Sequence, residues 1–255
     1  MTGVSFDPGS ARYAWQPSPR LGDAPALVVL PVGATEQHGP HLPVGVDSWL
    51  AEAVALRAAA IDGATLVAGA LPYGCSAHHT GFPGTVTLRP RVFIDVVLDV
   101  CRSLHRDGHT SVVVNGHGGN RGPLQVALAE LLAEGITAWA VSYFELVGDV
   151  AAELFPDPAT ATGHACALET SLILHLWPAA VDRSAVPPGG TPPSWPDPHL
   201  YATGAVQVAR RFEAINPTGV IGRPSDADAE AGRRLFEAAA DRLADVYARI
   251  RKATP

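Results

Sequence analysis

Cysteine is scarce in this chain, with only Cys75, Cys101 and Cys166 among 255 residues. No two of them stand in a Cys-x-x-Cys spacing, and an odd number of thiols cannot all pair in disulfides. A structural zinc site built from thiolates is therefore disfavoured. A reducing compartment is the simplest setting for such a protein.

Basic residues and long apolar runs are also scarce. The chain has 18 lysines and arginines against 25 aspartates and glutamates, a net charge of −7, which argues against nucleic-acid binding. No apolar run reaches the roughly 18 residues of a membrane span. Met1 to Arg20 lacks the basic start and apolar core of a signal peptide. We expect a cytoplasmic protein without membrane or nucleic-acid partners.

Apolar segments of strand and helix type alternate along the chain, and 47% of its residues are hydrophobic. This alternation predicts an α/β fold with a mainly parallel sheet. No linker or charge block divides the chain, so we expect one domain over residues 1–255. Strands are expected near 26–32, 65–71, 111–115 and 136–142, and helices near 48–60, 91–106, 122–134, 168–176 and 227–250, the last capped by Ser225 or Asp226.

Polar residues follow the first expected strand. Glu36 and His38 project to the same side if the chain stays extended beyond residue 32, because side chains alternate along a strand. One carboxylate and one imidazole would then meet a single metal ion. Asp47, just before the helix expected from Ser48, is either a third ligand or that helix's N-cap. The alternative for the whole segment is an ordinary polar turn.

A second histidine, His117, follows the strand expected at 111–115, inside Asn115-Gly-His-Gly-Gly-Asn120. The carboxyl ends of parallel strands are where ligands bind in open α/β sheets. A phosphate cradle is the alternative for these glycines, but no Lys-Ser/Thr follows, and the spacing is neither that of a P-loop nor Gly-x-Gly-x-x-Gly. The position therefore favours a site at the sheet edge over a phosphate cradle.

A third cluster is Gly163-His-Ala-Cys-Ala-Leu-Glu169, at the start of an apolar helix. His164 and Glu169 would point apart on one helix, so we expect His164 in the preceding loop. A glutamate among apolar residues is costly to bury unless it is paired or coordinated. Cys166 stands beside this cluster, but a nucleophilic thiol would be redundant with metal-activated water.

These clusters resemble the creatininase (creatinine amidohydrolase) family from about residue 24 to 250. The resemblance implies a three-layer α/β/α sandwich with a mainly parallel sheet, two divalent metal ions, and a homo-oligomer, typically a hexamer. It also implies hydrolysis of a C–N bond in a cyclic amide, formamide or peptide-like substrate. The matching segments are Thr35-Glu-Gln-His-Gly-Pro-His-Leu-Pro with Asp47, Tyr73-Gly-Cys-Ser-Ala-His-His79, Phe82-Pro-Gly-Thr85, Asn115-Gly-His-Gly-Gly-Asn120, His164 with Glu169-Thr-Ser171, and Gly219-Val-Ile-Gly-Arg-Pro.

The resemblance assigns roles position by position. Glu36, Asp47 and His117 match the ligands of one ion, and Asp47 would bridge to a second ion held by His38. Creatininase has a further glutamate ligand where this chain has Gly119, and Glu169 is our candidate replacement. His164 matches the catalytic histidine that passes a proton to the leaving nitrogen. Mixed oxygen and nitrogen ligands suit Zn, Mn or Fe.

Departures from creatininase concern the substrate. A tryptophan that stands against creatinine in that enzyme is Thr160 here, so creatinine itself is disfavoured. We expect substrate contacts from Ser76, His79, Gly118 and Trp195. Trp195 lies in a proline-rich loop at 186–198 that would close over substrate, or else pack on the surface or on a neighbouring subunit.

The sequence therefore predicts a metal-dependent amidohydrolase with a small-molecule substrate. Hydrolysis of an amide near neutral pH needs a hydroxide, stabilisation of the oxyanion and a proton for nitrogen. A metal-bound water with a pKa of about 7 supplies the hydroxide, and the ions stabilise the oxyanion. His164, with Glu169 beside it, supplies the proton for nitrogen. The alternatives are peptidase-like trimming of a short peptide and a non-hydrolytic or repurposed protein.

Overall fold

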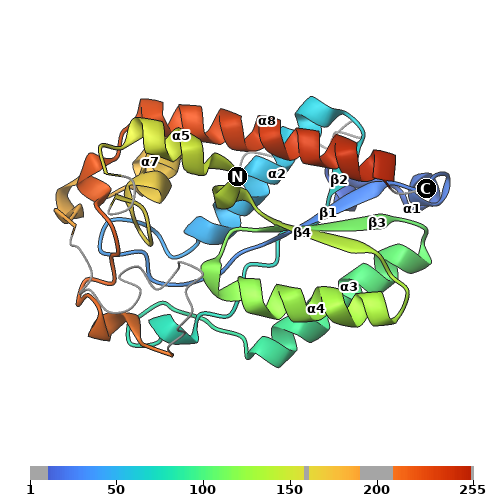
Figure 1. Cartoon of the computed structure of the whole chain (residues 1–255), viewed down its shortest axis with the longest axis horizontal. Helices are drawn as coiled ribbons and strands as arrows, with labels where there is room; N and C mark the ends of the chain where they lie inside the picture. Colours follow the sequence, from blue (N-terminus) through green and yellow to red (C-terminus); the bar gives the residue numbers. More distant parts are fainter. Residues whose placement is uncertain (1–10, 158–160, 190–208, 254–255) are drawn as a thin grey trace.

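Four parallel strands form the centre of the molecule (Figure 1). The computed structural model describes residues 11–157, 161–189 and 209–253. Strand β1 is buried along its whole length, as expected for an inner strand covered on both faces. The spatial order is β2-β1-β3-β4, with β1 spanning Leu27–Val32, β2 Thr65–Val67, β3 Thr110–Asn115 and β4 Ala138–Ser142.

Helices cover both faces of this sheet. On one face lie α2 (Val46–Asp62), α5 (Gly148–Leu154), α7 (Ala167–Leu176) and α8 (Ala229–Ala253), and on the other lie α3 (Pro90–Arg106) and α4 (Arg121–Ala133). Each face has its own hydrophobic core. The predicted α/β/α sandwich with a parallel sheet is confirmed.

Shorter helices connect these elements. A one-turn helix, α1 (Ser18–Gly22), precedes β1. The 3-10 helices span Tyr13–Trp15, Ala77–His79, Gly118–Asn120, Tyr143–Val147, Pro178–Ala180, Arg183–Ala185, Phe212–Ala214 and Pro224–Asp226. Three of them carry residues of the motifs described above: Ala77–His79, Gly118–Asn120 and Pro224–Asp226.

Helix α8 runs along α2 and α7. Its buried residues Leu235, Ala239, Leu243 and Tyr247 recur every fourth position, which places them on one stripe of the helix. At the carboxyl end, Arg251 donates hydrogen bonds to both carboxylate oxygens of Asp62 at the end of α2. This pair fastens α8 to α2 beside β2.

Two predicted boundaries were wrong. The second strand ends at Val67 rather than at residue 71, with only an isolated bridge joining Leu71 to Val32. The last helix is not capped by Ser225 or Asp226, which lie in a 3-10 helix begun by Pro224. Instead, the carboxylate of Asp228 accepts hydrogen bonds from the amides of Glu230 and Ala231, both at 3.0 Å.

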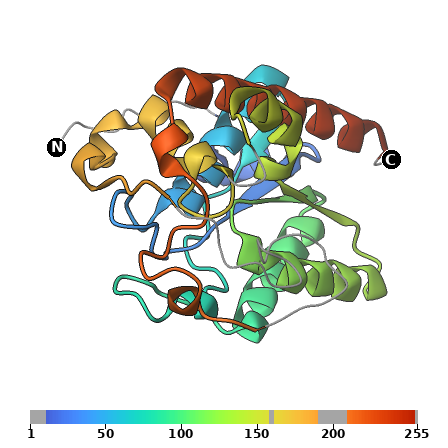
Figure 2. The same cartoon turned by 60° about the vertical axis from the view of Figure 1, so that its left-hand side comes forward.

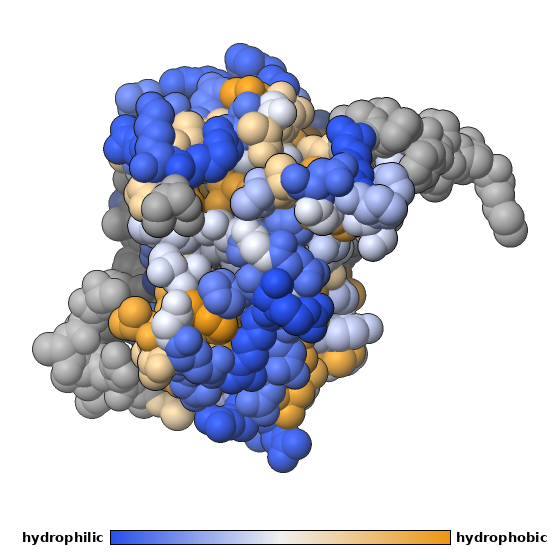
Figure 3. Space-filling model, turned by 90° about the vertical axis from the view of Figure 1, so that its right-hand side faces the viewer, coloured by the Kyte–Doolittle hydropathy of each residue, from blue (hydrophilic) through white to orange (hydrophobic). Residues whose placement is uncertain are grey.

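The two ends of the sheet differ. The carboxyl ends of the strands lead into the long loops on the left of Figure 1, which come forward in Figure 2. The opposite end faces the viewer in Figure 3, where hydrophilic residues predominate and apolar ones form separate patches. Among the described residues, no helix combines the length and apolar character needed to cross a membrane.

Candidate metal centre

The loop after β1 carries Glu36 and His38 into the interior, where both are fully buried. The amide of Glu36 donates to the carbonyl of Val44, and this contact folds the loop back on itself. The ligand atoms of Glu36, His38 and His164 lie within 4.8 Å of one another. The two side chains therefore meet, as alternation along an extended chain predicted.

Asp47 lies between two histidines. Its Oδ1 is 3.1 Å from Nε2 of His38, and its Oδ2 is 3.1 Å from Nδ1 of His117. The alternative that Asp47 caps α2 is wrong, because the helix begins at Val46 and Gly45 stands at the N-cap. The carboxylate instead lies in the first turn, where the helix dipole favours negative charge.

His117 follows directly after β3, and its neighbours hold its ring. Asn115 accepts a hydrogen bond from the His117 amide at 3.0 Å and donates one to its carbonyl at 2.8 Å. The ring Nε2 lies 3.2 Å from the carbonyl oxygen of Cys75, which can only accept, so this nitrogen carries a proton in the neutral ring. The lone pair of Nδ1 then faces Glu36 and Asp47, the arrangement of a metal-binding histidine.

The glycines after His117 do not form a phosphate cradle. Gly118–Asn120 is a 3-10 turn, and Asn120 donates from its amide to the carbonyl of Gly33 at 3.0 Å, which ties the two strand-end loops together. Glu36 lies 3.3 Å from His117. Negative charge so close to the loop opposes the binding of an anion.

Glu169 reaches the same centre from α7. Its Oε1 lies 3.9 Å from Nε2 of His38, and the ligand atoms of His38, Asp47 and Glu169 are within 4.8 Å of one another. His164 lies in the loop before α7, as expected, and exchanges two backbone hydrogen bonds with Ile221. The structure thus brings all five predicted metal ligands and His164 into one cluster.

Gln37 is a residue of the centre that the sequence analysis missed. Its side-chain nitrogen contacts the carbonyl of Gly219 at 3.0 Å and Nδ1 of His79 at 2.9 Å. Its backbone carbonyl oxygen lies 2.8 Å from Nε2 of His164, and its side-chain nitrogen lies 3.0 Å from the same atom. Its position between Glu36 and His38 was the one available signal.

The electrostatics of the cluster are those of carboxylates held against imidazoles. Burial opposes protonation of His38, but Asp47 outweighs it and raises the pKa of His38 to about 9. Burial raises the pKa of Glu169 to about 7, although His38 acts against this. Burial and the neighbouring His79 and His38 hold the pKa of His164 well below its usual range. His164 is therefore neutral near pH 7.

Buried carboxylate oxygens in this cluster lack donors. Among the described residues, both oxygens of Glu36 and Oδ2 of Asp47 are inaccessible to solvent and accept no hydrogen bond. A buried carboxylate without a partner is costly, and a cation is the group that would offset this cost. Oxygen and imidazole donors with no thiolate among them fit Zn, Mn or Fe.

A cavity of about 240 Å³ opens beside the cluster. Its polar lining residues include Asp47, His117, Gly118, His164 and Glu169, and its apolar ones include Tyr143, Phe144, Ala151 and Leu168. Of the four predicted substrate contacts, Gly118 lines this cavity, whereas Ser76 and His79 do not. Trp195, like Thr160, lies outside the described residues.

Arg121 is a second residue that the sequence analysis missed, and it lines the same cavity. Its guanidinium lies 5.1 Å from the ring centre of Phe144 and forms an ion pair with Glu145. The charge at position 121, directly after the Asn115 to Asn120 motif, was the signal for it. An arginine so placed suits a substrate carboxylate.

Cys166 also lines the cavity, but its thiol is unsuited to catalysis. Burial raises its pKa to about 12, so it stays protonated near neutral pH. All three cysteines are buried and free, which agrees with the expectation that they cannot all pair.

Comparison with known proteins supports this description. Residues 11–247 match the family model for creatininase, described as creatinine amidohydrolase. A mycofactocin precursor peptide peptidase from Mycobacterium tuberculosis is 35% identical over 239 residues, covering 88% of this chain and 85% of the relative. The creatinine amidohydrolase of Pseudomonas putida is 32% identical over 246 residues, covering 89% and 90%.

Solved structures agree with these relatives. A mutant creatininase of the Zn–Zn type superposes with a TM-score of 0.79 at 29% identity, covering 96% of this chain and 99% of that one. A manganese form of creatininase superposes with a TM-score of 0.76 at 31% identity, covering 93% and 94%. Fold, motif order and family match agree, and the chain belongs to the creatininase (creatinine amidohydrolase) family.

Proposed function

We propose that this protein is a metal-dependent amidohydrolase that cleaves a C–N bond in a small amide. The observation that carries the proposal is the position of Asp47, whose two oxygens each lie 3.1 Å from a different histidine, His38 and His117. A carboxylate that faces two separate imidazoles is suited to bridging a pair of cations, as in two-metal hydrolytic sites.

The donor sets suggest how two ions would be held. Glu36, Asp47 and His117 would hold one ion, and His38, Asp47 and Glu169 the other. When bound, divalent ions lower the pKa of a water molecule and offset the negative charge that develops on an amide oxygen. Zn and Mn are both compatible with these donors, and Fe is as well.

His164 is our candidate for the proton transfer that amide hydrolysis requires. Its Nε2 lies 2.8 Å from the carbonyl oxygen of Gln37. With the proton of the neutral ring on Nε2, Nδ1 would be the nitrogen that accepts and returns a proton. The Nδ1 atom lies 3.6 Å from Oε1 of Glu36, and the side chain lines the cavity. A neutral imidazole at this place can take a proton from water and deliver it to the leaving nitrogen.

The cavity supports a substrate with an apolar part and a negative charge. Tyr143, Phe144 and Leu168 supply the apolar wall, and Arg121 supplies the positive charge. Creatinine carries no carboxylate, which adds to the reasons for disfavouring it. Amides and formamides that bear a carboxylate are the first compounds we would test.

A second candidate function is the removal of residues from the carboxyl end of a short peptide. Two observations favour it: the relative at 35% identity is a precursor peptide peptidase, and Arg121 could bind the terminal carboxylate of a peptide. The two candidates share one metal centre and differ in the group that enters the cavity. A non-hydrolytic role is the remaining alternative.

Metal content per subunit is the primary test. Protein purified without chelator should contain about two ions, and Glu36→Ala and Asp47→Ala should both lose metal. Cyclic amides, formamides and short peptides with free or amidated carboxyl ends should then be screened. No bound metal in the wild type, even after incubation with Zn or Mn, would contradict the proposal and favour the non-hydrolytic alternative.

A further inference from the structure

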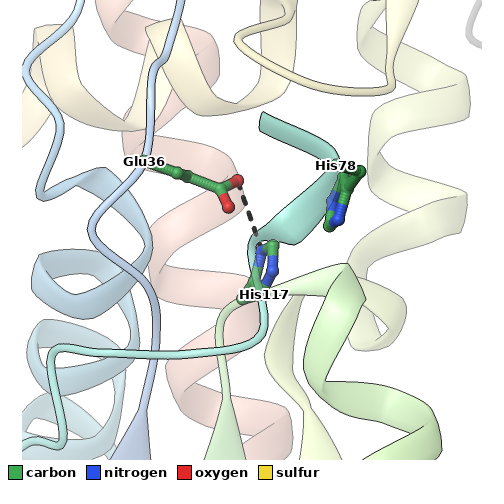
Figure 4. Close-up of side chains that lie close together, drawn as sticks. All are labelled: Glu36, His78 and His117. Carbon is green, nitrogen blue, oxygen red and sulfur yellow. Dashed lines mark ion pairs between the residues drawn. The ribbon is translucent and has the colours of Figure 1, made fainter. Parts of the chain in front are cut away.

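A further histidine, His78, lies close to the centre. His78 belongs to the 3-10 helix Ala77–His79, between β2 and α3. Figure 4 shows it beside Glu36 and His117, which come from the loops after β1 and β3. The ligand atoms of these three residues lie within 4.8 Å of one another. That spacing is short enough for a single cation to contact all three.

Neighbouring rings hold His78 in this position. Its ring is nearly parallel to that of His117, with an interplanar angle of 6° and centroids 5.6 Å apart. The rings of His79 and Phe212 contact it at 4.3 Å and 5.2 Å between centroids. The imidazole is therefore oriented by its packing, and half-burial leaves it partly shielded from water.

Gly119 makes room for this arrangement. A Cβ atom there would lie 2.9 Å from Cε1 of His78 and 2.5 Å from Nε2 of His117. It would also lie 2.3 Å from the carbonyl oxygen of Cys75, which is backbone and cannot easily move. A side chain at position 119 would thus displace the two imidazoles, and the glycine keeps them together.

The carboxylate of Glu36 is consistent with a cation at this position. Both of its oxygens are buried and accept no hydrogen bond from the residues that the structure describes. Nδ1 of His117 lies 3.3 Å from Oε1 of Glu36. Between this buried carboxylate and the two imidazoles, a divalent cation is a group that would satisfy all three at once.

We propose that His78 is a metal ligand, which together with Glu36 and His117 holds a divalent cation. This inference rests on the proposed function, because Glu36 and His117 also belong to the set that includes Asp47. The first ion would then have two imidazoles and two carboxylates as donors, whereas the second would have His38, Asp47 and Glu169. The set with fewer protein ligands leaves a position for water, as catalytic sites do.

Metal analysis of His78 variants tests the inference. In His78→Phe the ring is kept and the donor atoms are lost, so the affinity for Zn²⁺, measured by competition with a chromogenic chelator, should fall at least about 10-fold. In His78→Glu a donor is restored, and affinity should recover toward the wild-type value. His105→Phe, at an exposed histidine far from these ligand sets, is the matched control.

Substitution with Co²⁺ adds a readout that does not depend on activity. Loss of an imidazole ligand should change the visible absorption of bound Co²⁺ in His78→Phe, while His105→Phe keeps the wild-type spectrum. Should His78→Phe fail to fold by circular dichroism, His78→Gln takes its place in both measurements. Wild-type affinity and an unchanged spectrum in these variants would overturn the role of His78 alone. A wild type that binds no ion would overturn the proposed function as well.

Discussion

The Nε2 atom of His38 lies 3.1 Å from Oδ1 of Asp47, and both side chains are buried. The other oxygen of Asp47 lies at the same distance from His117. Because the carboxylate of Asp47 belongs to both proposed donor sets, its loss should affect the binding of both ions.

We therefore expect Asp47→Asn to reduce metal content from about two ions per subunit to nearly none, measured by elemental analysis. Glu36 belongs to only one of the two donor sets, so Glu36→Gln should lose about one ion. Equal metal content in wild type and Asp47→Asn would argue against a bridging role.

Glu169 should be a ligand of one ion. The variant Glu169→Gln keeps the size of the side chain but removes the charge, so it should lose about one ion and retain the other. The exposed Glu237→Gln, which disrupts only a surface pair with Arg57, serves as the control. If Glu169→Gln keeps its full metal content, the second ion needs another explanation and hydrolysis by a two-metal site is weakened.

His164 should act in proton transfer and not in metal binding. We expect His164→Gln to lower kcat by about 10² to 10⁴, the usual contribution of general acid–base catalysis, with metal content unchanged. Steady-state kinetics on the best substrate from the screen, paired with elemental analysis, separates the two effects. His105→Gln should leave both quantities as in the wild type. A loss of metal in His164→Gln would reassign this residue to the ligands.

Arg121 should select substrates that carry a carboxylate. Hydrogen bonds to charged groups contribute about 1.5–3 kcal/mol, so Arg121→Met should raise KM for such a substrate by about 10-fold or more. The matched compound with an amidated carboxyl group should be processed equally by wild type and variant. Arg91→Met changes an exposed arginine on α3 and controls for charge. An equal effect on both compounds would mean that Arg121 acts through packing.

Stability should depend on the pair between Asp62 and Arg251. Although burial opposes it, bonding to Arg251 and Thr65 lowers the pKa of Asp62 below its ordinary value of 3.8. A carboxyl group whose folded-state pKa is depressed stabilises the fold above its unfolded-state pKa and loses this contribution as pH falls through the folded-state value. Asp62→Asn should cost about 2 kcal/mol at pH 7.

Urea denaturation of metal-free protein measures this cost. The difference between wild type and Asp62→Asn should be complete at pH 6 and shrink progressively below pH of about 4. Metal is left out so that the titration of the metal ligands contributes equally to the free energy of unfolding of wild type and variant. A difference that stays constant down to the acid limit would show that the cost comes from neutral hydrogen bonds.

Much of the fold could be read from local patterns. Helix α3 was expected at 91–106 and spans Pro90–Arg106, because a proline at the start and an apolar stripe mark it. The three-residue β2 was overestimated because the apolar residues after Val67 continue a strand pattern that the sheet does not use. Helix α5 was not expected, since its seven residues are too few to show a clear period.

The sequence predicted which residues form the cluster better than it predicted the contacts between them. Glu36 and His38 are close in sequence, so alternation was enough to bring them together. Gln37 was overlooked, because its partners His79 and Gly219 are remote in the chain and glutamine gives no strong chemical signal. Ser76 and His79 were expected at the substrate, yet they do not line the cavity, and their side chains contact His117 and Glu36.

What the sequence determined by itself is the set of elements and the chemistry at their ends, because hydrophobic periodicity and the identity of residues after a strand are local properties. What only tertiary structure decided is which of those ends come together in one cluster. The imidazole of His164 meets the carbonyl of Gln37 across 127 residues of chain. Such a contact depends on how the parallel strands order themselves and how α7 and α8 pack over α2, and no local pattern encodes that distance.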